Sequence, residues 1–175
     1  MSTIAIEQAT THWAVDPEHT SVEFDVPSFW GLATVHGSFD RFAGSYETGP
    51  AGARIELAVD ADSLDTGNAT RDKHLRSSKF FHVVEHPQIH FLSTGVHDAG
   101  DGSLEVIGRL GVAGRATSLR FPATARRVGG ELEIEASTPV DQTELGMSTG
   151  TLGMIRRPAT LHVTARLHET TGEGR

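Results

Sequence analysis

Residues 127–136 read Arg127-Val128-Gly129-Gly130-Glu131-Leu132-Glu133-Ile134-Glu135-Ala136, and this stretch decides the class of fold. From residue 131 onward, apolar and acidic residues alternate, which is the period of a β-strand with one buried and one wet face. The two glycines before it can both adopt positive φ, as a two-residue hairpin turn requires. The stretch therefore predicts two antiparallel strands joined by a tight turn.

The same alternation recurs along the whole chain. It is regular at 22–26, 55–59, 132–136 and 161–165, and less regular at 12–16, 35–47, 88–97, 103–112 and 118–128. These runs predict eight or nine strands, separated by turn-forming residues. So many short antiparallel strands form either a sandwich or a closed barrel, and the alternation alone leaves that choice open.

Residues 61–87 interrupt this rhythm. Asn68 is suited to cap a helix, good helix formers follow it, and Pro87 is a natural terminator. We expect one or two short helices here, packed on one end of the strands through Leu75 and Phe80-Phe81. No linker or repeat is visible in the chain, so we expect residues 1–175 to form a single domain. Its core covers about 13–168, and the polar tail 169–175 is expected to be flexible.

Charge and composition exclude several classes of function. The chain has 23 acidic and 15 basic residues and a net charge of -8, which disfavours binding to nucleic acids or anionic membranes. Without cysteine it forms no disulfide, thiolate metal site or thiol nucleophile. No apolar run is long enough for a membrane span, and no signal peptide is visible, so we expect a cytoplasmic protein.

The candidate catalytic and metal motifs are weak. Gly146-Met147-Ser148-Thr149-Gly150 matches G-x-S-x-G, but that motif needs a strand-to-helix turn in an α/β sheet. His82, His86 and His90 recur every four residues, a spacing that aligns imidazoles on one helix, yet Pro87 breaks such a helix before His90. We therefore assign no catalytic residue, no metal and no cofactor.

An apolar set is left, and it forms the candidate binding site. Met147 and Met154 lie in a glycine-rich loop that cannot pack densely, and methionine suits an adaptable lining. The irregular segment 29–32 is also apolar, which a simple sandwich seldom tolerates. We therefore expect a cavity lined by Phe24, Phe29, Trp30, Leu32, Phe39, Phe42, Ile55, Leu57, Phe91, Leu110, Phe121, Ile134, Met147, Met154 and Leu161.

Several stretches resemble the YceI-like family. Residues 13–24, Trp13-Ala14-Val15-Asp16-Pro17-Glu18-His19-Thr20-Ser21-Val22-Glu23-Phe24, are similar to its opening pattern W-x-(I/V)-D-x-x-H-(S/T)-x-(V/I)-x-F. Residues 71–77, Arg71-Asp72-Lys73-His74-Leu75-Arg76-Ser77, followed by Phe80-Phe81, resemble its signature R-D-x-H-L-(R/K)-S-x-x-F-F. The resemblance extends from about Trp13 to Leu167.

The resemblance implies a lipocalin-like, eight-stranded antiparallel β-barrel that forms a homodimer. Its tunnel would take a polyisoprenoid chain, as in a quinone or a prenyl phosphate. The resemblance brings no catalytic residues, and it gives Arg71, Asp72 and His74 a structural role in tying the helical insert to the barrel. A clamp on a ligand headgroup is their alternative role. The chain departs from the family pattern at His82, where an acidic residue is usual, and over 146–157.

We therefore expect a non-catalytic carrier of a long apolar isoprenoid lipid. Two alternatives stay open. One is a dimeric stress-response or scaffold protein with no obligatory ligand, whose interior would be packed. The other is an enzyme acting on a prenyl substrate through a histidine near the mouth, such as His36, His74 or His90.

Overall fold

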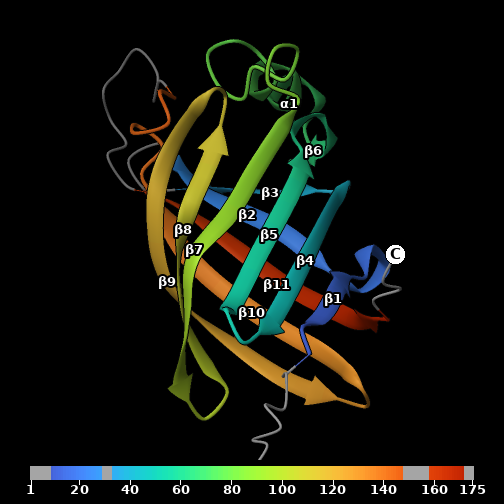
Figure 1. Ribbon diagram of the computed structural model, residues 1–175. Coiled ribbons are helices and arrows are strands. Elements are labelled where there is room, and N and C mark those ends of the chain that lie inside the picture. Colours follow the sequence, from blue (N-terminus) through green and yellow to red (C-terminus); the bar gives the residue numbers. More distant parts are fainter. Residues whose placement is uncertain (1–8, 29–32, 148–157, 172–175) are drawn as a thin grey trace, which may run out of the picture.

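A computed structural model describes residues 9–28, 33–147 and 158–171 (Figure 1). Among these residues, eleven strands form one antiparallel sheet. They are β1 (Thr11–Val15), β2 (Ser21–Ser28), β3 (Ala33–Phe39), β4 (Phe42–Gly49), β5 (Gly52–Asp60), β6 (Leu64–Asp65), β7 (Gln88–Gly100), β8 (Ser103–Val112), β9 (Arg115–Val128), β10 (Glu131–Val140) and β11 (Ala159–Thr170). The helical elements are the 3-10 turns η1 (Pro17–His19) and η3 (Ala61–Ser63) and the helix α1 (Ala69–Leu75).

The eleven strands make an eight-stranded barrel because three positions around it are each occupied by two consecutive strands. β1 and β2 both pair with β11, on either side of η1. β3 and β4 follow one another along β2 and β1, while η3 separates β5 from β6. The circumference runs β1-β4-β5-β7-β8-β9-β10-β11 and closes through the β1–β11 pairing. The predicted antiparallel barrel is confirmed, and the choice between sandwich and barrel is settled.

The hairpin between β9 and β10 forms as the sequence of residues 127–136 predicts. Gly129 and Gly130 have φ values of 59° and 87°, and Val128 faces Glu131 across the turn. From there the alternation assigns the two faces of β10. Leu132 is buried at the inner face, whereas Glu135 is exposed. The residue pattern and the barrel geometry therefore agree because a strand turns successive side chains to opposite faces.

The insert between β6 and β7 covers one end of the barrel (Figure 1). The Asn68 side chain caps α1 by accepting a hydrogen bond from the amide of Arg71 at 3.0 Å. α1 ends at Leu75, well before Pro87, so the expectation that Pro87 terminates the helix is wrong. Consecutive turns fill the chain between α1 and β7. Among the described residues, no helix has the length and apolar character needed to cross a membrane.

The opposite end of the barrel is filled by a small apolar cluster. Trp13, Tyr46, Leu132 and Leu167 are all buried there, on strands β1, β4, β10 and β11. The Arg127 guanidinium lies over the Trp13 ring, 4.9 Å from its centre, which is a distance typical of a cation–π contact. This cluster therefore forms a floor, and the covered space lies between it and α1.

Candidate functional site: the barrel cavity

A cavity of about 750 Å³ occupies the barrel between the floor and the insert. This volume lies within the range of roughly 300–1,000 Å³ that small-molecule sites occupy. Tyr46 and Leu167 of the floor line it at one end, and Leu75, Phe80 and Phe81 of the insert line it at the other. The space is therefore enclosed by the barrel wall, the floor and the insert, and the side chains of the described residues leave it unfilled.

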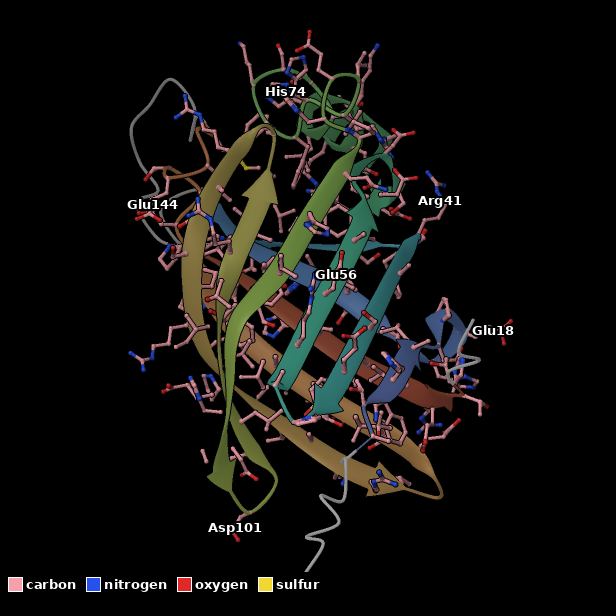
Figure 2. The ribbon with its side chains drawn as sticks, viewed as in Figure 1. Glu18, Arg41, Glu56, His74, Asp101 and Glu144 are labelled. Atoms are coloured by element: carbon pink, nitrogen blue, oxygen red, sulfur yellow. The ribbon has the colours of Figure 1, made fainter. Side chains whose placement is uncertain are left out.

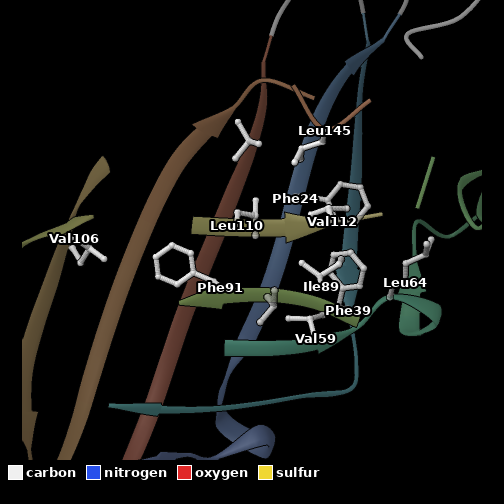
Figure 3. Packing of buried hydrophobic residues seen from close by; sticks show 14 residues of the cluster. Phe24, Phe39, Val59, Leu64, Ile89, Phe91, Val106, Leu110, Val112 and Leu145 are labelled. Atoms are coloured by element: carbon white, nitrogen blue, oxygen red, sulfur yellow. The ribbon is translucent and has the colours of Figure 1, made fainter. Parts of the chain in front are cut away.

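The inward face of alternate strand residues makes the wall of the cavity. On β8, Val106, Leu110 and Val112 are at most 5% exposed, and Gly108 and Gly111 separate them. On β7, Ile89 and Phe91 are buried while His90 between them faces out. Figure 3 shows these side chains projecting from neighbouring strands into one apolar interior. Figure 2 shows charged side chains such as Arg41 and Asp101 reaching away from the barrel.

Phenylalanine rings organise the wall nearest the insert. The rings of Phe24 and Phe39 have centroids 5.3 Å apart, and Phe81 of the insert packs edge-on against Phe39 at 5.8 Å. On the other wall, Phe91 and Phe121 pack at 5.6 Å. Such tilted and edge-on pairs are favourable beyond their buried area. Phe81 thus anchors the insert to two strands and closes the interior at this end.

Polar side chains are a minority of the described cavity wall, and some of them have partners within the protein. Arg71 donates from Nε and Nη2 to the hydroxyl and the carbonyl of Thr66, both at 2.7 Å. The Gln142 amide oxygen accepts from the amide of Ala159 at 2.9 Å. His74 differs, because among the described residues its ring nitrogens have no hydrogen-bond partner, and its ring packs edge-on against Phe80. A polar group of a ligand can therefore meet an available donor or acceptor at His74.

Residues of α1 hold the insert in place, in a way the sequence predicts only in part. Buried Asp72 accepts hydrogen bonds from the amide and the hydroxyl of Thr66, the residue that Arg71 also binds. These contacts fix the start of the helix. The link to the barrel comes from Arg76, which donates to the carbonyls of Asp62 and Leu64 at 2.9 and 2.8 Å. Sequence reasoning missed Arg76, although it stands in the stretch that resembles the family signature.

A turn after β10 contributes the second part of the cover. Leu145 is 4% exposed and packs into the main core, and Met147 lies on the cavity wall. The hydroxyl of buried Thr117 on β9 donates to the carboxylate of Glu144. Hydrogen bonds from the hydroxyl and amide of Thr143 lower the pKa of Asp141, so this carboxylate stays charged and holds the turn.

The predicted lining residues fall into three groups. Those on the cavity wall are Phe24, Phe39, Ile55, Leu57, Phe91, Leu110, Phe121, Ile134, Met147 and Leu161. Phe42 packs against the core cluster but is not among the wall residues. Phe29, Trp30, Leu32 and Met154 lie outside the described residues. That the wall residues bind a ligand stays a prediction.

The sequence reasoning missed many of the smaller wall residues. Val22, Val106, Ala123 and Val163 line the cavity as the aromatic residues do. They could have been found from the alternation itself, because each lies an even number of positions from a predicted lining residue on the same strand. The predicted lining favoured large side chains and therefore left out these smaller residues.

Two of the three histidines considered as catalytic groups face away from the cavity. His90 Nε2 lies 3.0 Å from the Glu56 carboxylate on the outer face. His36 contacts Asp25, which also lies 3.0 Å from His162 Nε2. Burial tends to raise the pKa of Asp25, but hydrogen bonds from His36 and His162 outweigh it and lower that pKa. Of the three candidates, His74 is the one at the cavity.

Comparison with known proteins identifies the fold and the family. The UPF0312 protein of Pectobacterium atrosepticum is 34% identical over 109 residues, covering 61% of this chain and 56% of that protein. A UPF0312 protein of Yersinia pestis is 38% identical over 100 residues, covering 55% of this chain and 51% of the relative. The chain thus spans about half the length of the curated relatives it matches.

Solved structures share the barrel at lower sequence identity. Burkholderia cenocepacia BcnA superposes with a TM-score of 0.78 at 20% identity, covering 87% of this chain and 98% of BcnA. A domain from Saccharophagus degradans, described as a polyisoprenoid binding domain implicated in plant cell wall breakdown, gives 0.74 at 14% identity, covering 90% and 98%. These likenesses establish the fold. The sequence model of the YceI-like domain family matches residues 13–167 of this chain. This chain therefore belongs to the YceI-like family.

Proposed function

We propose that this chain is a non-catalytic carrier that holds a long apolar isoprenoid lipid, of the quinone or prenyl-phosphate type, in the barrel cavity. The observation that carries the proposal is the cavity of about 750 Å³, whose wall consists mainly of aliphatic and phenylalanine side chains. An apolar cavity of this kind does not hold water well and accepts apolar guests. The Saccharophagus relative described as polyisoprenoid binding has the same fold, which supports this class of ligand.

The driving force for such binding is the removal of methylene groups from water. Each buried CH₂ group contributes about 0.8 kcal/mol, so a five-carbon unit contributes on the order of 3–4 kcal/mol. Ordering the flexible chain and losing rigid-body freedom subtract from this sum. We therefore expect affinity to rise with chain length until the lipid reaches the floor formed by Trp13 and Tyr46.

The head of the ligand belongs at the end of the barrel covered by α1. His74 lies there, is exposed, and has an unpaired imidazole among the described residues (Figure 2). Arg71 is close by in sequence, and its two hydrogen bonds to Thr66 fix the orientation of its guanidinium while engaging only two of its five N–H donors, so it is a second, less available contact. A few polar groups at a mouth fix orientation, whereas the apolar wall gives the affinity. We thus assign headgroup contact to His74 before Arg71.

The carrier hypothesis is favoured over the scaffold and enzyme hypotheses. A scaffold protein with no obligatory ligand has no need of an unfilled interior, and unfilled apolar volume destabilises a fold. An enzyme needs a second group positioned beside its acid or base. His36 and His90 lie on the outer face, and His74 has no ionisable hydrogen-bond partner among the described residues.

Native mass spectrometry of protein purified from its own host, followed by organic extraction, tests the proposal. We expect a quinone or prenyl lipid that co-purifies at about one per subunit and is recovered chemically unchanged. Saturated fatty acids of similar length serve as the matched control ligands. A clean apo mass that stays unchanged after incubation with prenyl lipids contradicts the carrier function, and a chemically altered lipid favours the enzyme.

Two broader expectations belong with this proposal. The family resemblance implies a homodimer, and light scattering coupled to size-exclusion chromatography measures that mass directly. The second expectation is a cytoplasmic location, which fractionation of cells of the native host measures.

A further inference from the structure

We propose that His82, Glu85 and His86 form a binding site for a divalent transition metal of the zinc class, on the outer side of the insert. One ligand atom from each side chain lies within 4.8 Å of the other two. The two imidazole rings are 5.5 Å apart between centroids and are inclined at 73°. Two imidazoles and a carboxylate are a donor set that suits Zn²⁺ and its neighbours and does not suit Mg²⁺ or Ca²⁺.

The local backbone brings the three side chains to one face. The amide of His86 donates to the carbonyl of His82 at 2.9 Å, which closes one turn of the chain. The segment is a turn and not a helix, with His82 at a φ of 47°, and this turn brings the ligand atoms of the three side chains together. The sequence His82-Val83-Val84-Glu85-His86 has the H-x-x-E-H spacing in which a class of zinc peptidases uses both histidines as ligands. Here the spacing stands on one turn outside a barrel, so it supports metal binding and not peptidase chemistry.

The side chains of His82, Glu85 and His86 are available for coordination. Among the described residues, none of them has a hydrogen-bond or ion-pair partner besides the contact between the two rings. The second cluster of this kind, Asp16 with Glu18 and His19, differs because His19 Nδ1 already lies 2.7 Å from the Asp16 carboxylate. At residues 82–86 the lone pairs are therefore available to an ion.

Contacts with the barrel preorganise His86. Its ring occupies the space beside Gly114 in the β8–β9 turn, where an added Cβ would come within 2.7 Å of the imidazole. Gly114 has a φ of 77°, so a residue with a side chain is disfavoured there on backbone grounds as well. Glu85 and His86 also line an open cleft of about 520 Å³, which leaves room for coordinating water. Tetrahedral Zn–N bonds of about 2.0–2.1 Å place two nitrogens roughly 3.3–3.5 Å apart, so small side-chain rotations complete the site.

Titration calorimetry of the full chain with Zn²⁺ at neutral pH, after treatment with a chelator, measures the site. We expect one saturable site per chain and no response to Mg²⁺. His82→Asn and His86→Asn each remove a ligand, and the affinity falls by more than the roughly 10–100-fold that outer contacts of metal sites contribute. Glu85→Gln changes an exposed side chain and keeps the fold, so its weaker binding reports on the metal alone. His97→Asn, an exposed histidine on β7, is the matched control and binds as the unaltered chain does.

Two further results decide the assignment. X-ray absorption of the zinc-loaded chain should show two imidazoles in the first coordination shell, and the thermal midpoint should rise with Zn²⁺ because the ion binds the folded state more tightly than the unfolded chain. The absence of saturable binding overturns the proposal, as does unchanged binding in the double variant His82→Asn/His86→Asn. Loss of binding in His19→Asn would instead assign the ion to the turn before β2.

Discussion

The ring of Phe24 occupies the space that a side chain at position 37 would need. Phe24 and Gly37 are register partners on β2 and β3, and a Cβ at Gly37 would come within 2.2 Å of the ring. Phe91 approaches Gly108 in the same way, although its register partner is Leu110, and a Cβ at Gly108 would come within 2.5 Å of the ring. Because neither glycine has a side chain, each ring can lie flat against the barrel wall. The lumen therefore stays open.

Gly37→Ala should push the Phe24 ring toward the lumen. We expect a loss of about 1–3 kcal/mol in the free energy of unfolding, the usual range for overpacking, and weaker lipid binding because the cavity shrinks. Gly111→Ala is the control, since its Cβ would meet no atom closer than 3.7 Å. Urea unfolding and lipid titration of both variants measure the two effects. Equal stability of the two variants would show that the close approach at Gly37 imposes no constraint.

Phe91→Arg places a charge on the cavity wall. Phe91 is 8% exposed, and an unpaired guanidinium there costs several kcal/mol unless it escapes to water. We expect the folded fraction to retain no lipid in native mass spectrometry. His90→Arg, one residue earlier and on the outer face, should retain lipid as the unaltered chain does. A folded Phe91→Arg protein with normal lipid content would place the ligand somewhere other than the lumen.

The barrel could be predicted from the sequence because its information is local. A strand that buries one face repeats with a period of two, so the alternation around Phe24, Ile134 and Leu161 already assigns which side chains face inward. The hairpin at Gly129-Gly130 is equally local. The Asn68 cap predicted where α1 begins for the same reason.

The details of the site could not be predicted because they depend on register between distant strands. Nothing near Phe42 in the sequence shows that it packs beside the cavity wall and not on it. The contact of Phe81 with Phe39 joins residues on separate elements. The fit of His86 against Gly114 likewise depends on how the insert lies on the β8–β9 turn. Such contacts follow only from the assembled fold.

Glu133→Gln tests the ion pairs on the outer face. Glu133 on β10 bridges Arg166 at 2.8 Å and Arg126 at 2.9 Å, on the two neighbouring strands. Hydrogen bonds from Arg166 and then Arg126 lower the pKa of Glu133. A lowered folded-state pKa stabilises the fold above the unfolded-state pKa, and this contribution is lost as pH falls through the folded-state value.

We therefore expect Glu133→Gln to be slightly less stable than the unaltered chain at neutral pH, with the difference vanishing in acid. High salt should reduce the difference because both arginine side chains are open to solvent, although the Glu133 side chain is only 16% exposed. Glu135→Gln, on the same strand and exposed, is the control and should change little. Thermal unfolding across a pH series measures both variants. A difference that persists below the pKa of Glu133 would mean that packing, and not charge, is responsible.

Arg76→Ala should loosen the cover of the cavity. The Arg76 side chain joins α1 to the barrel through the carbonyls of Asp62 and Leu64, and Leu64 is only 1% exposed. Removing the guanidinium leaves a buried carbonyl without its donor, which costs about 1–3 kcal/mol. The insert carries Phe81 across the end of the lumen, so lipid should also leave faster.

Hydrogen exchange of residues 66–87 and the rate of lipid release measure these two effects together. Lys73→Ala alters an exposed side chain on the same helix and should change neither. Arg76→Lys keeps the charge but loses the forked geometry that reaches both carbonyls, so it should fall between the two variants. Faster exchange without faster release would show that lipid leaves by a route that the insert does not cover.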